Sequence, residues 1–127
     1  MVASLLLLVE TGLAGALGAL ARYLLGRFVA ERVGSALPVG TLLINVTGAF
    51  VIGVLFALSA RRVLPPALYV ILATGFLGGY TTFSTMSWEG VQLIRGGNAR
   101  GSVLYLGSSV VLGCTGAAVG LLVGRVL

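Results

Sequence analysis

Residues 74–85 read Thr-Gly-Phe-Leu-Gly-Gly-Tyr-Thr-Thr-Phe-Ser-Thr, and this stretch lies inside a long apolar segment. It combines three glycines with a dense block of hydroxyl side chains. Glycine costs about 1 kcal/mol relative to alanine inside a helix, and β-branched threonines follow two adjacent glycines here. We therefore expect a helix that breaks within this stretch. The alternative is that the threonines bond back to carbonyls one turn earlier and only bend a continuous helix.

The composition around this stretch points to lipid as the solvent of the whole chain. Of the 127 residues, 58% are hydrophobic and only 9% are charged, and the mean hydropathy is +1.13. Soluble domains carry roughly 25% charged residues. The chain is therefore predicted to be a single transmembrane domain, residues 1–127. Its first apolar segment lacks a basic leading region, so we expect a retained span rather than a cleaved signal.

Four segments are long enough to cross a bilayer. A helix rises about 1.5 Å per residue, so a hydrocarbon core of about 30 Å needs about 20 apolar residues. The segments that meet this requirement are 3–26, 38–60, 66–94 and 102–124. The sequence thus predicts an all-α membrane protein with four transmembrane helices, the third of them broken near the bilayer midplane.

The reactive side chains are too few for the usual kinds of enzyme. The chain has no His, Lys or Asp, three glutamates, and Cys114 as its one cysteine. General acid–base and metal-assisted hydrolysis both lack their parts. The net charge of +5 comes from eight arginines, which lie mostly between the apolar segments. That position indicates loops and lipid headgroups rather than nucleic acid.

The arginines hardly select an orientation in the membrane. Four spans place both termini on one side, and the connections on the two sides carry three and four arginines. These are Arg61, Arg62 and Arg125 on one side, and Arg27, Arg32, Arg95 and Arg100 on the other. With so little bias the chain can insert both ways, and two copies can form an antiparallel dimer. The alternative is a single orientation set by features outside this count.

Polar side chains inside the spans are the candidate functional residues. They are Arg22, Thr41, Asn45, Glu89, Tyr105, Ser108 and Ser109. Such residues are costly in lipid and mark ion pathways by default, although single serines and threonines also act as contacts between helices. Most are neutral hydrogen-bond donors, which favours a small hydrated anion, and the ring of Phe83 has a positive edge that can face one. The backbone carbonyls freed at the break would instead suit a cation.

Three groups of residues resemble a known family. They are Gly15-Ala16 with Arg22-Tyr23, then Gly40 to Asn45 with Gly48 and Gly53, and finally Gly75 to Thr85 followed by Glu89. Together they resemble the Fluc/CrcB family of bacterial fluoride channels, and the resemblance covers essentially the whole chain. It implies a fluoride-selective channel, multi-pass in the bacterial inner membrane, that exports fluoride passively and confers fluoride resistance.

The resemblance also implies an assembly and a set of site residues. The assembly is an antiparallel, dual-topology homodimer with two fluoride pores and a central sodium ion held by the backbone carbonyls of Gly78 and Thr81. The implied pore residues are Asn45, Thr41, Phe83, Ser84, Thr85, Tyr105 and Ser109, and Arg22 and Glu89 match charged positions typical of the family. Two positions depart from the pattern. Met86 replaces a second phenylalanine and has no ring edge, and Gly113 stands where a second track serine often occurs.

Two other functions compete with the channel. A small multidrug-resistance-type, proton-coupled exporter would share the size, the four spans and the dual topology. It would need a carboxylate in the first span, where Glu10 is the only one. A structural or regulatory membrane subunit without a pore would need none of the polar residues for transport.

Overall fold

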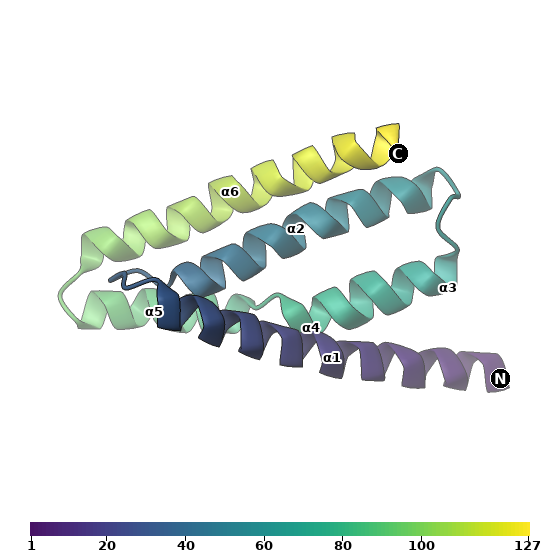
Figure 1. Cartoon of the computed structure of the whole chain (residues 1–127), viewed down its shortest axis with the longest axis horizontal. Coiled ribbons are helices and arrows are strands. Elements are labelled where there is room, and N and C mark those ends of the chain that lie inside the picture. Colours follow the sequence, from purple (N-terminus) through teal and green to yellow (C-terminus); the bar gives the residue numbers. More distant parts are fainter.

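The computed structural model describes all 127 residues as helices joined by short connections (Figure 1). The helices are α1 (Val2–Arg32), α2 (Val39–Ala60), α3 (Pro66–Tyr69), the π-helix η1 (Val70–Leu77), α4 (Gly78–Tyr80), α5 (Phe83–Arg95) and α6 (Ala99–Val126). Counting Pro66–Arg95 as one span, four stretches are long and apolar enough to cross a membrane, which confirms the four predicted spans. Both termini lie at the same end of the molecule.

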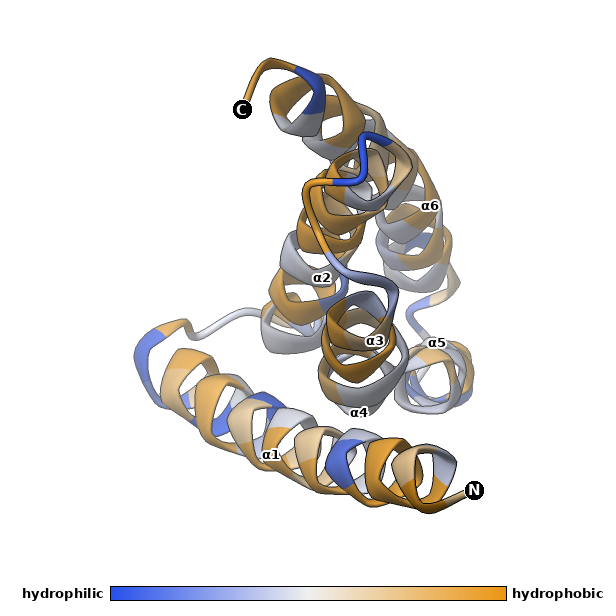
Figure 2. Ribbon diagram, turned by 90° about the vertical axis from the view of Figure 1, so that its right-hand side faces the viewer, coloured by the Kyte–Doolittle hydropathy of each residue, from blue (hydrophilic) through white to orange (hydrophobic).

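The surface is apolar, as lipid requires. Only 16 of the 127 residues are buried, and large apolar side chains are exposed along every span. Figure 2 shows this apolar character around the outside of the helices. A soluble monomer rarely exposes contiguous apolar patches of this extent. The chain is therefore a multi-pass membrane protein.

Two of the predicted span boundaries were too short. Helix α1 continues to Arg32, so Arg27 and Glu31 lie on its last turns rather than in a connection. The two side chains form an i,i+4 ion pair at 3.0 Å, and such pairs support a helix beyond its apolar part. Helix α6 begins at Ala99 because the Asn98 side chain accepts a hydrogen bond from the Gly101 N–H at 2.9 Å.

The third span changes its backbone conformation midway. Helix α4 ends at Tyr80, Thr81 and Thr82 have extended backbones, and α5 begins at Phe83. The Thr81 hydroxyl donates to the Leu77 carbonyl at 2.8 Å, which is the back-bonding considered above. The Thr82 side chain instead caps α5 by accepting from the Thr85 N–H at 3.2 Å. The two neighbouring threonines thus end one helix and begin the next.

Glycines allow the third span to approach α1 closely. A Cβ added at Gly18 would collide with the Phe76 carbonyl, and one added at Gly79 would collide with the Gly15 carbonyl. The contact is therefore reciprocal, with one glycine on each side facing a backbone oxygen of the other. Small residues permit such contacts in lipid, where packing rather than the hydrophobic effect joins helices. The reciprocal glycine contact positions η1 and α4 against α1. The opposite side of the third span then faces α2.

Candidate functional site

Two hollows meet at Thr82, on either side of the extended residues. The larger has a volume of about 680 Å³ and the smaller of about 350 Å³, and Thr82 lines both. The larger takes in Arg22, Thr41, Thr85 and Glu89 among the predicted site residues. The smaller takes in Asn45, Gly78, Thr81, Phe83 and Met86.

Asn45 of α2 holds the extended residues in place through two hydrogen bonds. Its Nδ2 donates to the Thr82 carbonyl at 2.9 Å, and its Oδ1 accepts from the Thr82 N–H at 2.9 Å. The carboxamide thus gives Thr82 the acceptor and donor that a helix would otherwise supply. A primary amide has two N–H donors, so one remains after this pairing. The bonds fix its orientation, since rotating the amide would break both.

The smaller hollow is electrically neutral and exposes an aromatic ring. None of its lining residues is charged, and Phe83 is 77% exposed. Gly48 gives the Thr81 methyl group its space, because a Cβ at that glycine would collide with it. The wall therefore offers an amide, hydroxyls and a ring, with Met86 as a further apolar side chain.

Two helix ends meet beside this neutral hollow, the end of α4 and the start of α5. The carbonyl of Thr81 has no hydrogen-bond partner. The Gly78 carbonyl lacks the donors that a continuing helix would provide, because the Thr81 N–H goes to Leu77 and the Thr82 N–H to Asn45. These carbonyl oxygens suit a hard cation. On the other side α5 begins at Phe83, and a helix N-terminus favours negative charge.

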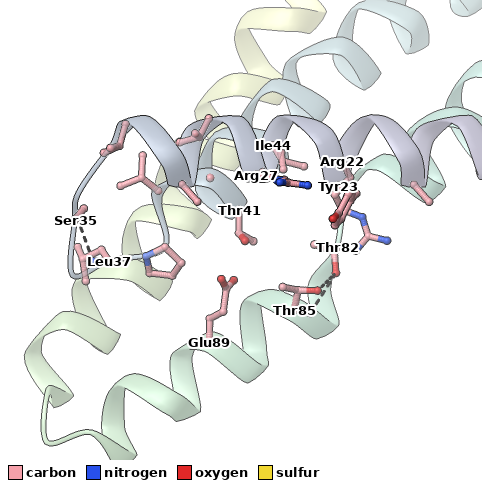
Figure 3. A pocket seen from close by; sticks show the side chains of 18 residues that line it. Arg22, Tyr23, Arg27, Ser35, Leu37, Thr41, Ile44, Thr82, Thr85 and Glu89 are labelled. Atoms are coloured by element: carbon pink, nitrogen blue, oxygen red, sulfur yellow. Dashed lines mark hydrogen bonds between the residues drawn. The ribbon is translucent and has the colours of Figure 1, made fainter.

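The larger hollow combines charge with hydroxyl groups. Figure 3 shows Thr41 and Glu89 pointing toward one another across it, with Arg22 close to Thr82. Arg22 forms no ion pair. The Thr85 hydroxyl accepts a hydrogen bond from the Thr82 hydroxyl at 3.0 Å, so its own hydrogen is available. Arg22 and these hydroxyls together give this space several donors for an anion.

Three predicted track residues line neither hollow. Tyr105 is buried and its hydroxyl donates to Glu89 Oε1 at 3.0 Å. The Ser109 hydroxyl donates to the Tyr105 carbonyl at 2.8 Å. Both hydroxyl hydrogens are thus engaged within the protein. Ser84 is exposed, with its Oγ 3.4 Å from the Thr82 Oγ1.

Sequence reasoning gave Thr82 no role of its own, although the structure places it at the centre of the site. A capping signal was present, since a threonine precedes a helical segment with a polar residue three positions later. The Tyr80 hydroxyl, 2.9 Å from Thr47 Oγ1, was also missed. The Thr47 hydrogen already goes to main-chain carbonyls, so Tyr80 is the donor in this pair. By contrast Glu10, on which the exporter hypothesis depended, is exposed on α1 and lines neither hollow.

The chain was compared with known protein families and proteins. The family model described as CrcB-like protein, Camphor Resistance (CrcB), matches residues 9–121. A protein of Acidobacterium capsulatum is 48% identical over 89% of this chain and 91% of its own length. Relatives in Solibacter usitatus and Citrifermentans bemidjiense are each 42% identical, over 89% and 94% of this chain and 93% and 98% of their own lengths. All three relatives are named fluoride-specific ion channel FluC.

Proposed function

This chain belongs to the CrcB family, and we propose that it is a fluoride-specific ion channel of the bacterial inner membrane. It is a conduit rather than an enzyme. Fluoride passes down its electrochemical gradient, which lowers the fluoride concentration in the cytoplasm and gives resistance to it. The observation that carries the proposal is the neutral hollow in which two hydrogen bonds fix the Asn45 amide.

The fixed amide suits a small anion that must exchange water for protein donors. Asn45 keeps one N–H after pairing with Thr82, and this donor needs no reorientation when the anion arrives. The ring of Phe83 adds a positive edge, and the first N–H groups of α5 add the positive end of a helix. A larger halide would gain less from the same donors, because its hydrogen bonds are longer and electrostatic attraction falls with distance.

The larger hollow serves this pathway as its aqueous entrance. Arg22 raises the local anion concentration, and Thr41 and Thr85 provide hydroxyl groups beyond it. Thr82 forms part of both walls, so an ion that leaves one hollow meets the other across a single residue. Tyr105 and Ser109 act behind Glu89, as the support of its carboxylate rather than as direct ligands of fluoride.

The pathway is completed by a second, antiparallel copy of the chain. Within one copy the groove at Thr81 and Thr82 lies open, Phe83 is largely exposed, and a Cβ added at Gly78 would meet nothing within 4 Å. Polar backbone at membrane depth requires cover by protein or water, and the interruption falls near the middle of the third span, close to the bilayer midplane. The nearly balanced arginines favour opposite orientations for the two copies.

The carbonyl groups of Gly78 and Thr81 fit a sodium ion at the contact between the copies. The unpaired Thr81 carbonyl is the observation that supports this assignment. A bound cation would supply positive charge and would tie together the ends of the two α4 helices. The protein's own contribution is to hold these carbonyls free of hydrogen-bond donors. Asn45 takes the Thr82 N–H that a helix would give to Gly78, and the Thr82 hydroxyl takes the Thr85 N–H that a helix would give to Thr81.

Anion flux from liposomes tests the function. Purified protein should release fluoride from loaded vesicles and release chloride at least about a hundredfold more slowly, a factor worth about 2.7 kcal/mol of barrier. An imposed pH gradient should not drive uptake. The Phe83→Leu variant tests the ring, because it keeps an apolar side chain without the ring edge. It should slow fluoride flux. Equal fluoride and chloride fluxes would refute selectivity, and uptake driven by protons would favour the exporter.

A further inference from the structure

Three arginines gather at the end of the molecule that carries both termini. Arg61 and Arg62 follow α2, and Arg125 lies in the last turn of α6. The Arg61 Nη1 donates to the Gly124 carbonyl at 2.9 Å, which joins the two helix ends directly. Figure 1 shows the connection after α2 beside the C-terminal end of α6. We call Arg61, Arg62 and Arg125 the terminal arginine cluster.

No carboxylate forms an ion pair with this cluster. The one ion pair of the protein joins Arg27 and Glu31 near the far end of α1, and the terminal cluster has no equivalent. Glu89 lines the larger hollow. Glu10 lies on α1 and forms no ion pair. The three exposed guanidinium groups therefore lack an anionic partner within the chain.

Apolar side chains are exposed on the membrane side of the cluster, since Phe56 of α2 and Leu122 of α6 are 56% and 61% exposed. The cluster itself stands where α2 and α6 end, which is the level of the lipid headgroups for spanning helices. Charge outside and apolar surface inside is the pattern of a phospholipid with its phosphate at the surface.

We propose that the terminal arginine cluster binds the phosphate of an anionic membrane phospholipid. Guanidinium groups bind phosphate oxygens through two parallel hydrogen bonds. Arg61 is held by Gly124 and so fixes the position of the site, while Arg62 and Arg125 have no partner in the structure and remain available. The exposed Phe56 and Leu122 on the membrane side of the cluster identify a lipid as the source of the phosphate rather than the free ion. Lipid binding at this cluster does not depend on the transported ion.

Lipid retention in native mass spectrometry tests the proposal on the full-length protein. The probes are dioleoylphosphatidylglycerol, dioleoylphosphatidylcholine and inorganic phosphate. Arg62→Gln/Arg125→Gln removes two charges but keeps the bond from Arg61 to Gly124. Because each arginine near a membrane surface contributes appreciably to anionic lipid binding, retention of phosphatidylglycerol should fall on the order of tenfold or more. The control Arg95→Gln/Arg100→Gln removes the same charge at the opposite end and should retain the lipid.

Several outcomes would overturn this assignment. Equal retention by the cluster variant and the wild type would remove these arginines from lipid binding. Equal retention of phosphatidylcholine would show that negative charge is not recognised. A rise in melting temperature with inorganic phosphate, of the size given by phosphatidylglycerol, would identify the free ion as the ligand instead. Tryptophan emission from Trp88, the one tryptophan, provides that melting curve and confirms that each variant is folded.

Discussion

At the scale of single residues, Asn45 supplies what the backbone loses between α4 and α5. Its amide pairs with both polar groups of Thr82, although the two residues are 37 positions apart. A polar backbone group left without a partner in a buried site costs about 1–3 kcal/mol. An apolar side chain of similar size at position 45 would leave two such groups unpaired.

The Asn45→Asp variant tests this pairing. A carboxylate can still accept from the Thr82 N–H, but it cannot donate to the Thr82 carbonyl and would place negative charge beside the pathway. We expect fluoride flux to fall by about tenfold or more, since the lost hydrogen bond and the added negative charge together cost at least about 1.4 kcal/mol. Flux from liposomes measures the effect.

The Asn98→Asp variant is the matched control for that substitution. Asn98 also accepts a backbone hydrogen bond, from Gly101, but only as the N-cap of α6. Aspartate and asparagine cap helices about equally well. This variant should keep wild-type flux. If both variants conduct equally well, Asn45 has no part in conduction.

Individual contacts of this kind lay beyond sequence reasoning. The sequence identified Asn45 as an intramembrane polar residue, because such residues are costly without a partner. It did not identify the partner, which is a main-chain group on another element. The same holds for Tyr105 and Ser109, whose spacing suggested a donor track and whose hydrogens are engaged by Glu89 and a carbonyl.

At the scale of elements, the capping of α5 depends on one hydroxyl. The Thr82 Oγ1 accepts from the Thr85 N–H, so Thr82→Ala should lower stability by about 1 kcal/mol. Thr82→Ser keeps the hydroxyl and should retain most of that stability. Melting temperatures in detergent would measure both variants. Equal melting temperatures for the alanine and serine variants would show that the cap does not stabilise the fold.

The contact between α1 and the third span gives a second test at this scale. Gly79→Ala would place a methyl group against the Gly15 carbonyl, and overpacking of this kind costs about 1–3 kcal/mol. Gly12→Ala, at an exposed position of α1, is the control, because nothing lies within 4 Å of its added Cβ. That variant should be stabilised by about 0.5–1 kcal/mol through helix propensity. Similar losses from both would contradict a close contact at Gly79.

Helix positions were predictable from composition, whereas helix forms and ends were not. Four apolar segments of sufficient length define four spans in any bilayer. The ion pair between Arg27 and Glu31 extends α1 into charged sequence, where hydropathy gives no signal. The π-helical form of Val70–Leu77 has no marker in its apolar composition. It depends on how the whole span packs against α1.

At the scale of the whole molecule, the proposed antiparallel pair predicts that orientation limits function. The pair Gly34→Arg and Ala99→Arg adds positive charge at the end away from the termini and so favours one orientation in the membrane. The pair Ala60→Arg and Leu127→Arg adds it at the end that carries the termini and favours the opposite orientation. Each biased chain alone should give a fluoride-sensitive bacterium little resistance, because only parallel pairs can form. Growth on raised fluoride measures this.

Coexpression of the two oppositely biased chains is the decisive arm of that experiment. It should restore resistance, since each then meets a partner in the opposite orientation. Full resistance from either biased chain alone would exclude the antiparallel assembly. The four substituted positions are all exposed, so the arginines should leave the packing unchanged.

The uncharged lining of the smaller hollow has one more consequence, for acid conditions. None of its eleven lining residues can gain or lose a proton. Acidification therefore changes no charge on the lining of this hollow, and protons act instead on the dissolved halide, by converting it to its neutral acid. A bacterium in an acidic habitat would thus keep a working conduit at the very time when the acid form enters its cytoplasm fastest.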